Sequence, residues 1–169
     1  VRDYGAKGDG VADDSAAFEA ADAAAGGRTV LVSAGTYRLA SSVTFESPVR
    51  FEGKLVMHAA ARLALTRNFD FPTYAKAFDD ERQGLIKAIQ ALFNFTDHTT
   101  LDLCGRRVEL DAPIDVQGAV VNQTGYQIRR VIRNGQFNIV AGAGWETGTA
   151  TATASYSAAS PRTLSGIAN

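Results

Sequence analysis

The first clear hydrophobic pattern in the chain predicts an amphipathic helix over residues 15–25. The apolar positions recur at the three- and four-residue spacing of one helical face: Ala17, Phe18, Ala21, and Ala24 or Ala25. Asp13, Asp14 and Ser15 open this segment, and acidic or hydroxyl side chains favour a helix start because they accept its free amide hydrogens. Glu19 and Asp22 provide the polar face, and Gly26-Gly27 predicts the end.

Short strands are predicted after this helix. RTVLVSAGTYRL, SVTF and VRFEGKLVM are rich in Val, Leu, Phe and Thr, and Gly, Ser or Pro separates them. Ala34-Gly35 divides the first of these segments into two strands. A chain of short strands joined by tight turns is typical of a mainly β protein.

The same order of elements then recurs. DDERQGLIKAIQALF begins with Asp79-Asp80 and predicts a second amphipathic helix over about residues 80–93. TTLDLCGRRVEL then matches RTVLVSAGTYRL, with Leu101 opposite Leu31 and Gly105 opposite Gly35. APIDV (112–116) matches SSVTF, and RNGQFNIV matches FEGKLVM with Gly135 opposite Gly53. Repeated units of short strands and glycine turns indicate a solenoid, in which each unit covers the apolar face of the next.

The repeat predicts three regions. Residues 1–70 hold the first helix and the first unit of strands, and residues 71–141 hold the second, longer unit. Residues 142–169 begin with an Ala-, Thr- and Ser-rich loop. Leu164–Ile167 is expected to re-enter the sheet, and the chain is expected to continue beyond Asn169.

Composition adds mainly exclusions. The 169 residues carry a formal net charge of −1, so no strong overall field favours nucleic acid or an anionic membrane surface. No apolar run approaches the roughly 18–20 residues of a membrane-spanning helix. Cys104 is the only cysteine, which excludes an internal disulfide and a thiolate metal cluster.

The opening VRDYGAKGDGVADDSAAFEAA, followed by GGRTVLVSAGTYRL, resembles the N-terminal segment of the pectate-lyase-like right-handed β-helix superfamily. The matching motif positions are Asp3, Tyr4, Gly5, Gly8, Asp9, Gly10, Asp13, Asp14, Ser15, Gly35 and Tyr37. The superfamily includes secreted pectate lyases and polygalacturonases and many tailspike proteins of tailed bacteriophages. The resemblance implies a mainly β fold, a right-handed parallel β-helix, here with two amphipathic helices as caps.

A cap gives the motif a structural purpose. The end of a β-helix exposes an apolar interior and unpaired strand edges, and a helix with one apolar face can cover both. The glycines permit turns with positive φ, and Asp9 and Asp13 can accept hydrogen bonds from neighbouring amides in such turns.

Other chemical interpretations of these residues are weaker. GAKGDG lacks the spacing of a phosphate-binding loop. Calcium at Asp9, Asp13 and Asp14 is conceivable because it prefers carboxylates, but helix capping already accounts for these acids. His58 and His98 lack metal-ligand spacing. We therefore expect no metal and no cofactor.

No catalytic residue is assigned. Glycosidases use two carboxylates about 5–10 Å apart, whereas Asp79-Asp80 opens a predicted helix, and Asp102, Asp111 and Asp115 are expected to face solvent. A basic stretch in the second unit is interpreted as a solvated face or as inter-subunit ion pairs, with an anionic glycan or partner protein as the alternative: Arg106, Arg107, Arg129, Arg130 and Arg133.

The leading hypothesis is a structural, receptor-binding spike or fibre of a tailed phage or phage-like particle such as a gene transfer agent. The resemblance implies a homotrimer that contacts other tail or baseplate proteins and binds cell-surface polysaccharide, in a virion or extracellular setting. One alternative is the N-terminal part of an extracellular polysaccharide lyase or hydrolase, with its catalytic residues outside residues 1–169. Another is a free-standing carbohydrate-binding module.

Overall fold

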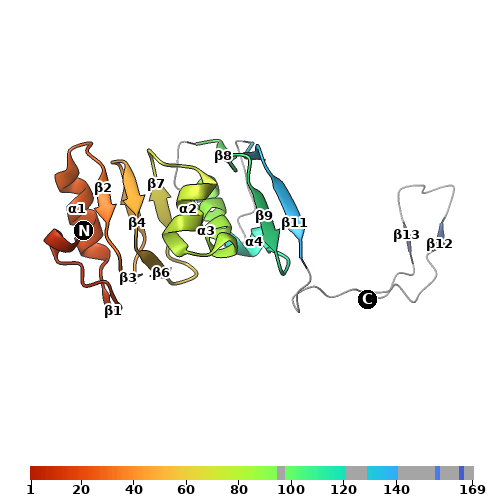
Figure 1. Ribbon diagram of the computed structural model, residues 1–169. Coiled ribbons are helices and arrows are strands. Elements are labelled where there is room, and N and C mark those ends of the chain that lie inside the picture. Colours follow the sequence, from red (N-terminus) through yellow and green to blue (C-terminus); the bar gives the residue numbers. More distant parts are fainter. Residues whose placement is uncertain (95–97, 121–128, 141–154, 157–163, 166–169) are drawn as a thin grey trace.

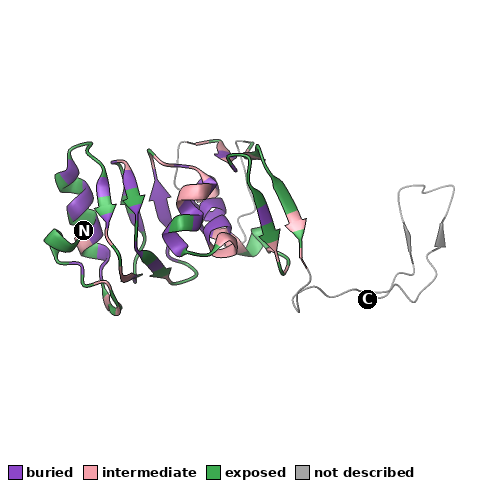
Figure 2. Ribbon diagram, viewed as in Figure 1, coloured by how far each residue is buried: buried purple, intermediate pink, exposed green. Residues whose placement is uncertain are grey.

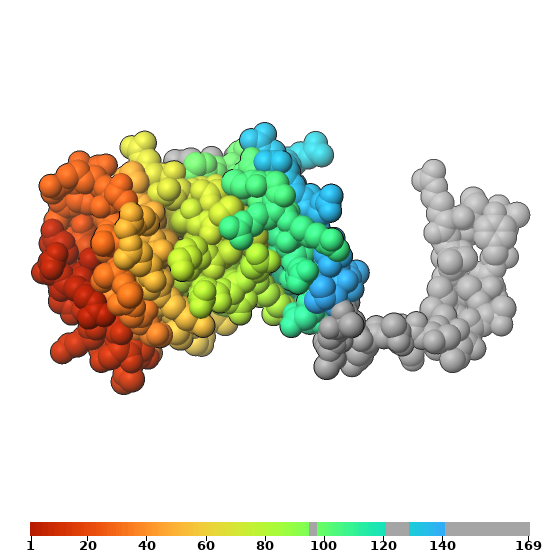
Figure 3. All heavy atoms as spheres, viewed as in Figure 1, coloured from red at the N-terminus to blue at the C-terminus, as the bar shows by residue number. Residues whose placement is uncertain are grey.

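The computed structural model describes residues 1–94, 98–120, 129–140, 155–156 and 164–165. The described residues up to 140 form an elongated body in which successive parts of the chain follow one another from one end to the other (Figures 1 and 3). The first half contains, in order, η1 (Arg2–Tyr4), β1 (Asp9–Asp13), α1 (Ser15–Ala25), β2 (Val30–Val32), β3 (Thr36–Leu39), β4 (Val43–Phe45), β5 (Val49–Phe51), β6 (Lys54–Met57) and β7 (Leu63–Leu65). The second half contains α2 (Phe71–Phe78), α3 (Glu81–Asn94), β8 (Thr100–Asp102), β9 (Arg107–Leu110), α4 (Val116–Ala119), β10 (Val131–Arg133), β11 (Gln136–Ile139), β12 (Ser155–Tyr156) and β13 (Leu164–Ser165).

The strands form short parallel sheets between successive layers of the chain. In the first half, β1, β3 and β6 form one sheet, β2 pairs with β5, and β4 pairs with β7. In the second half, β8 pairs with β10 and β9 pairs with β11, also in parallel. β12 and β13 form a separate antiparallel pair. The predicted re-entry of Leu164–Ile167 lies partly outside the described residues, and its described part pairs with β12.

Alternation along these strands builds the core. In β2, β4 and β5 the two outer residues are buried and the middle one is exposed, as expected when every second side chain points inward. The parallel register then places the buried positions of neighbouring strands next to one another. Tyr37 on β3 pairs with Leu55 on β6, and both are almost fully buried. Figure 2 shows this buried interior running through the body between exposed outer positions.

Two glycines allow neighbouring turns to approach closely. A Cβ on Gly53 would lie 2.5 Å from the carbonyl oxygen of Ser33, and a Cβ on Gly135 would lie 2.6 Å from that of Arg106. Real side chains do not tolerate such distances. Gly53 and Gly135 were matched by the sequence repeat, and each lies beneath the turn of the preceding layer.

The first predicted helix agrees with α1, and Figure 1 shows it at the N-terminal end of the body. Phe18 is fully buried beneath it, with its ring edge-to-face against Tyr37 at 5.3 Å and against Phe45 at 6.0 Å. The expectation that Asp22 belongs to the polar outer face is wrong. Asp22 is buried, and its carboxylate accepts hydrogen bonds from the amides of Glu46 and Ser47.

The second helical region contains more helix than the pattern predicted. α3 corresponds to the expected helix over about 80–93, but α2 precedes it and packs against it. Asp70 caps α2 by accepting a hydrogen bond from the Thr73 amide. Gly84 permits the contact between the helices, since a Cβ there would lie 2.7 Å from the Cα of Ala75.

The predicted correspondence between residues 112–116 and the strand in SSVTF is wrong. The structure has no strand there; instead Asp115 caps the short helix α4 by accepting a hydrogen bond from the Gly118 amide. Pro113 lacks an amide hydrogen, which disfavours a strand inside a ladder. Among the residues that the structure describes, no helix is long and apolar enough to cross a membrane.

Candidate functional site

The N-terminal loop is fixed by one buried carboxylate. Asp14 is 1% exposed, and its two oxygens accept hydrogen bonds from the amides of Lys7 (2.6 Å) and Gly8 (3.1 Å). Asp14 occupies the N-cap position of α1, but its side chain makes no capping hydrogen bond. It binds the glycine loop instead, which corrects the expectation that it accepts the helix amides.

The two neighbouring acids also bind backbone amides. Asp9 accepts from Val11 and Ala12 at 2.8 and 2.9 Å. Asp13 accepts from the Ser15 hydroxyl at 2.6 Å and from the Ala40 amide at 3.0 Å. These hydrogen bonds hold the pKa of both carboxyl groups below their usual range, chiefly through Val11 for Asp9 and through Ser15 for Asp13. Asp9 is thus bound to its own turn, and Asp13 links the start of α1 to the turn after β3. Within the described ranges no group of three or more His, Cys, Asp or Glu residues could hold a metal ion.

The glycines of the motif meet the buried tyrosine. Gly8 has φ 65°, and a Cβ there would lie 2.9 Å from the Tyr37 ring. Gly35 has φ 151°, and a Cβ there would lie 3.0 Å from the Gly8 carbonyl oxygen. Tyr37 therefore fills the space that both glycines leave, and only glycine suits either backbone position.

Arg2 completes this cluster, and sequence reasoning missed it. Its guanidinium donates hydrogen bonds to the Ser33 hydroxyl, the Tyr37 hydroxyl and the Ala34 carbonyl oxygen, and it lies 5.8 Å from the centre of the Tyr37 ring. The signal in the sequence was a single arginine beside the motif. Asp3 and Tyr4 of the motif are exposed in η1, and Gly5 ends that helix with φ 95°.

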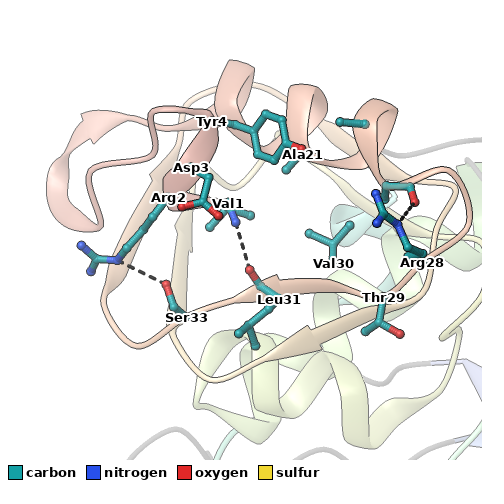
Figure 4. Close-up of a pocket in the computed structure, with 12 residues that line it drawn as sticks. Val1, Arg2, Asp3, Tyr4, Ala21, Arg28, Thr29, Val30, Leu31 and Ser33 are labelled. Carbon is teal, nitrogen blue, oxygen red and sulfur yellow. Dashed lines mark hydrogen bonds between the residues drawn. The ribbon is translucent and has the colours of Figure 1, made fainter.

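An open hollow of about 470 Å³ lies between η1, α1 and β2 (Figure 4). Several of the polar groups that line it form hydrogen bonds with other groups of the protein. The Val1 nitrogen donates to the Leu31 carbonyl oxygen at 3.0 Å, and the Arg28 Nε donates to the Ala25 carbonyl oxygen at 3.1 Å. These hydrogen bonds attach the N-terminus to β2 and the end of α1 to the turn that follows it, so these polar groups stabilise the fold.

Polar side chains of α3 bind the turn between β6 and β7. Lys87 is fully buried, and its ammonium donates to the carbonyl oxygens of His58, Ala59 and Ala61. Burial, with a smaller repulsion from Arg62, lowers the pKa of Lys87 to about 8. Gln90 also donates to Ala59, at 2.9 Å. The sequence analysis predicted only that these residues lie on a helix, and no sequence signal indicated that they would be buried.

The other acids considered for catalysis are dispersed. Asp79 ends α2 with φ 50°, and Asp80 accepts a hydrogen bond from the Gln83 amide at the start of α3. Asp102 accepts from the Cys104 amide and from Asn134, whereas Asp111 and Asp115 are exposed on other segments. Asp79 and Asp80 line a small hollow together with Glu81 and Arg106, and Asp102, Asp111 and Asp115 are not part of its lining.

The basic residues of the second unit contact several different groups. Arg106 lies 3.5 Å from Glu81, and Arg133 lies 3.5 Å from Asp102. Arg130 donates to the carbonyl oxygen of His98, whose ring stacks on Phe69. Arg107 and Arg129 are exposed. Exposed ion pairs of this kind contribute about 0–1 kcal/mol each.

Comparison with known proteins identifies the family. Neither the curated proteins nor the solved structures gave a match. A family model described as rhamnogalacturonase A/epimerase, pectate lyase-like, matches residues 1–160. This range covers the motif, both groups of parallel strands and all three of the longer helices. The chain therefore belongs to the pectate lyase-like, rhamnogalacturonase A/epimerase family.

Proposed function

We propose that this chain forms the capped N-terminal part of a right-handed parallel β-helix that binds polysaccharide. Residues 1–70 and 71–141 are its two successive units, and α1 caps its N-terminal end. α3, which was expected to be a second cap, instead packs between the two units, where it contacts β7 of the first and β8 and β9 of the second. The observation that carries this proposal is the packing of α1, which places Phe18 on Tyr37 and Phe45 at the end of the parallel strands. The same strand pairs recur in both units, β2 with β5 and β8 with β10, which supports the division.

The biological setting is part of the same proposal. The protein is a receptor-binding spike or fibre of a tailed phage or phage-like particle, acting in the virion or outside the cell. It assembles as a homotrimer, contacts other tail or baseplate proteins, and recognises the surface polysaccharide of a host. Membership of a pectate lyase-like family supports the binding of polysaccharide. The resemblance of the opening motif to tailspike proteins supports the assignment to a phage or phage-like particle.

The test combines assembly and binding. The full chain is examined by native mass spectrometry and is applied to immobilised capsular and lipopolysaccharide glycans from candidate hosts. We expect a trimer that is retained on at least one glycan. A stable monomer that no glycan retains would contradict the proposal.

The family description also favours a second function, a polysaccharide lyase or hydrolase whose catalytic residues lie outside residues 1–169. Incubation of the chain, alone and in its longest natural form, with rhamnogalacturonan and pectate separates the two. New reducing ends or unsaturated products would favour the enzyme, and binding without cleavage would favour the spike.

A further inference from the structure

The turn between β10 and β11 consists of two exposed residues, Asn134 and Gly135. Asn134 has φ 57°, a left-handed conformation that asparagine adopts more readily than most other residues. A Cβ on Gly135 would lie 2.5 Å from the Cβ of Leu103 and 2.6 Å from the carbonyl oxygen of Arg106. The packing of this turn on the preceding layer therefore requires glycine at position 135 and favours asparagine at position 134.

This pair of residues is chemically reactive. The backbone nitrogen that follows an asparagine can attack its side-chain carbonyl carbon, and glycine has no side chain to obstruct the approach. The asparagines at positions 68, 94, 122 and 138 precede Phe, Phe, Gln and Ile, which are all larger. Three other glycine turns have no side-chain amide before the glycine: Ala34-Gly35, Glu52-Gly53 and Cys104-Gly105.

The surroundings of the turn leave the attacking group free and hold the side chain that it attacks. Among the described residues, the backbone amide of Gly135 has no hydrogen-bond partner. The side-chain Nδ2 of Asn134 donates to Oδ1 of Asp102, on β8 of the preceding layer, at 2.9 Å. A side chain that is hydrogen-bonded to a carboxylate is less free to turn towards its own backbone, so this contact slows the attack.

We propose that Asn134 is a site of spontaneous deamidation, which Asp102 retards in the folded chain. The Gly135 nitrogen forms a bond to Cγ of Asn134, and the bond from Cγ to Nδ2 breaks. Nδ2 leaves as ammonia and takes the proton of the Gly135 nitrogen. Water then opens the five-membered imide at one of its two carbonyl carbons. The product is aspartate, or isoaspartate with one additional carbon atom in the backbone.

Either product disturbs the last parallel layer of the described body, where Figure 1 shows β11 beside β9. A carboxylate at position 134 replaces the donor to Asp102 with a second negative charge. Isoaspartate also lengthens the two-residue turn that joins β10 to β11, whose registers on β8 and β9 are regular. Deamidation should therefore loosen this layer irreversibly as the protein ages. The inference does not depend on polysaccharide binding.

The experiment incubates the full chain at pH 8, well below its melting temperature, and follows aspartate and isoaspartate by mass spectrometry of proteolytic peptides. A synthetic peptide of residues 130–138 is the unfolded reference. Asn134 should react more slowly in the folded chain than in the peptide, and well before Asn138, which lies in the same layer. Absence of product at Asn134 after the peptide has reacted fully, or equal conversion at Asn138, would overturn the site.

Substitutions of Asp102 test its retarding role. Asp102→Ala should speed the reaction at Asn134 by about tenfold, the effect of losing one hydrogen bond to a charged group. Asp102→Asn keeps an acceptor and should give an intermediate rate. Glu109→Ala is the matched control, because Glu109 is an exposed carboxylate on β9 that pairs with Asn138. An Asp102→Ala rate equal to that of the control would overturn this role.

Amide hydrogen exchange tests the structural consequence. Exchange at residues 131–133 and 136–139 should be faster in the aged, deamidated chain than in the fresh chain. Asn134→Gly permits the same positive φ but has no side-chain amide, so exchange in this variant should not change with age. Unchanged exchange in the deamidated chain, or an equal increase in Asn134→Gly, would overturn the loosening of the layer.

Discussion

Replacing Lys87 with methionine tests how a buried ammonium group contributes to the contact between α3 and the turn after β6. Methionine keeps a long unbranched side chain but cannot donate hydrogen bonds. The substitution therefore removes both the buried charge and the donor that serves His58, Ala59 and Ala61.

At neutral pH these two changes oppose each other. The lowered pKa of Lys87, about 8 against 10.5, corresponds to about 3 kcal/mol of unfavourable burial that methionine relieves. The loss of a donor costs about 1–3 kcal/mol for the buried carbonyl of Ala61. His58 and Ala59 are exposed to water, and Ala59 also keeps Gln90. We expect the free energy of unfolding at pH 7 to change by no more than about 2 kcal/mol.

The pH dependence has a definite sign. The pKa of Lys87 is lower in the folded chain than in the unfolded chain, so between about pH 8 and 10.5 the unfolded chain binds the extra proton. Raising the pH through this window therefore favours the folded state. The contribution of Lys87 grows by about 2 kcal/mol between pH 7 and 9.5, and the methionine variant lacks it.

Urea unfolding followed by circular dichroism at pH 7 and pH 9.5 measures this difference. The matched control is Lys76→Met, since Lys76 is exposed on the neighbouring helix α2. The unmodified chain should gain about 2 kcal/mol over Lys87→Met between the two pH values, and the control should follow the unmodified chain. A difference between the unmodified chain and Lys87→Met that does not change with pH would refute the reasoning.

Three further substitutions test the packing of the helices. Phe18→Ala should lower the free energy of unfolding by about 3–5 kcal/mol, because it empties the space under α1, whereas Glu19→Ala on the exposed face should change it by less than about 0.5 kcal/mol; equal losses in urea melts would show that α1 does not cap the core. Gly84→Ala should cost about 1–3 kcal/mol, because the new methyl group would lie 2.7 Å from the Cα of Ala75; an unchanged melting temperature would contradict the close contact of α2 and α3. Asp22→Ala should cost about 2 kcal/mol by leaving two amides without an acceptor, and faster amide hydrogen exchange at residues 46 and 47 should accompany it; unchanged exchange would disprove this role.

Hydrophobic periodicity predicted the elements whose polar face is exposed to solvent or whose ends carry a clear sequence signal. α1 begins at Ser15, whose amide and hydroxyl donate to Asp13, and it ends before Gly26, which has a φ of 57°; both signals are local. The strand pairs of the two units were predictable from the matched glycines, since Gly53 and Gly135 meet the same steric demand under a neighbouring turn.

Elements decided by distant contacts could not be predicted in this way. α2 contains Phe71, Thr73 and Tyr74, which favour strands in isolation, and only Asp70 followed by Pro72 signalled a helix start. Asp22, Lys87 and Gln90 are polar residues that become buried because turns elsewhere in the chain present free amides or carbonyls. Hydrophobic patterning does not report such demands.

The register of the strands has a practical consequence for engineering. Val49 pairs with Val30 after a connection of 18 residues, whereas Val131 pairs with Thr100 after one of 30, and both pairings are parallel and regular. The fold therefore absorbs about a dozen additional residues between two layers without a change of register. Asp111, an exposed described position in the longer layer, is a candidate insertion point, where a foreign epitope or a small binding peptide could be displayed from an otherwise unchanged scaffold.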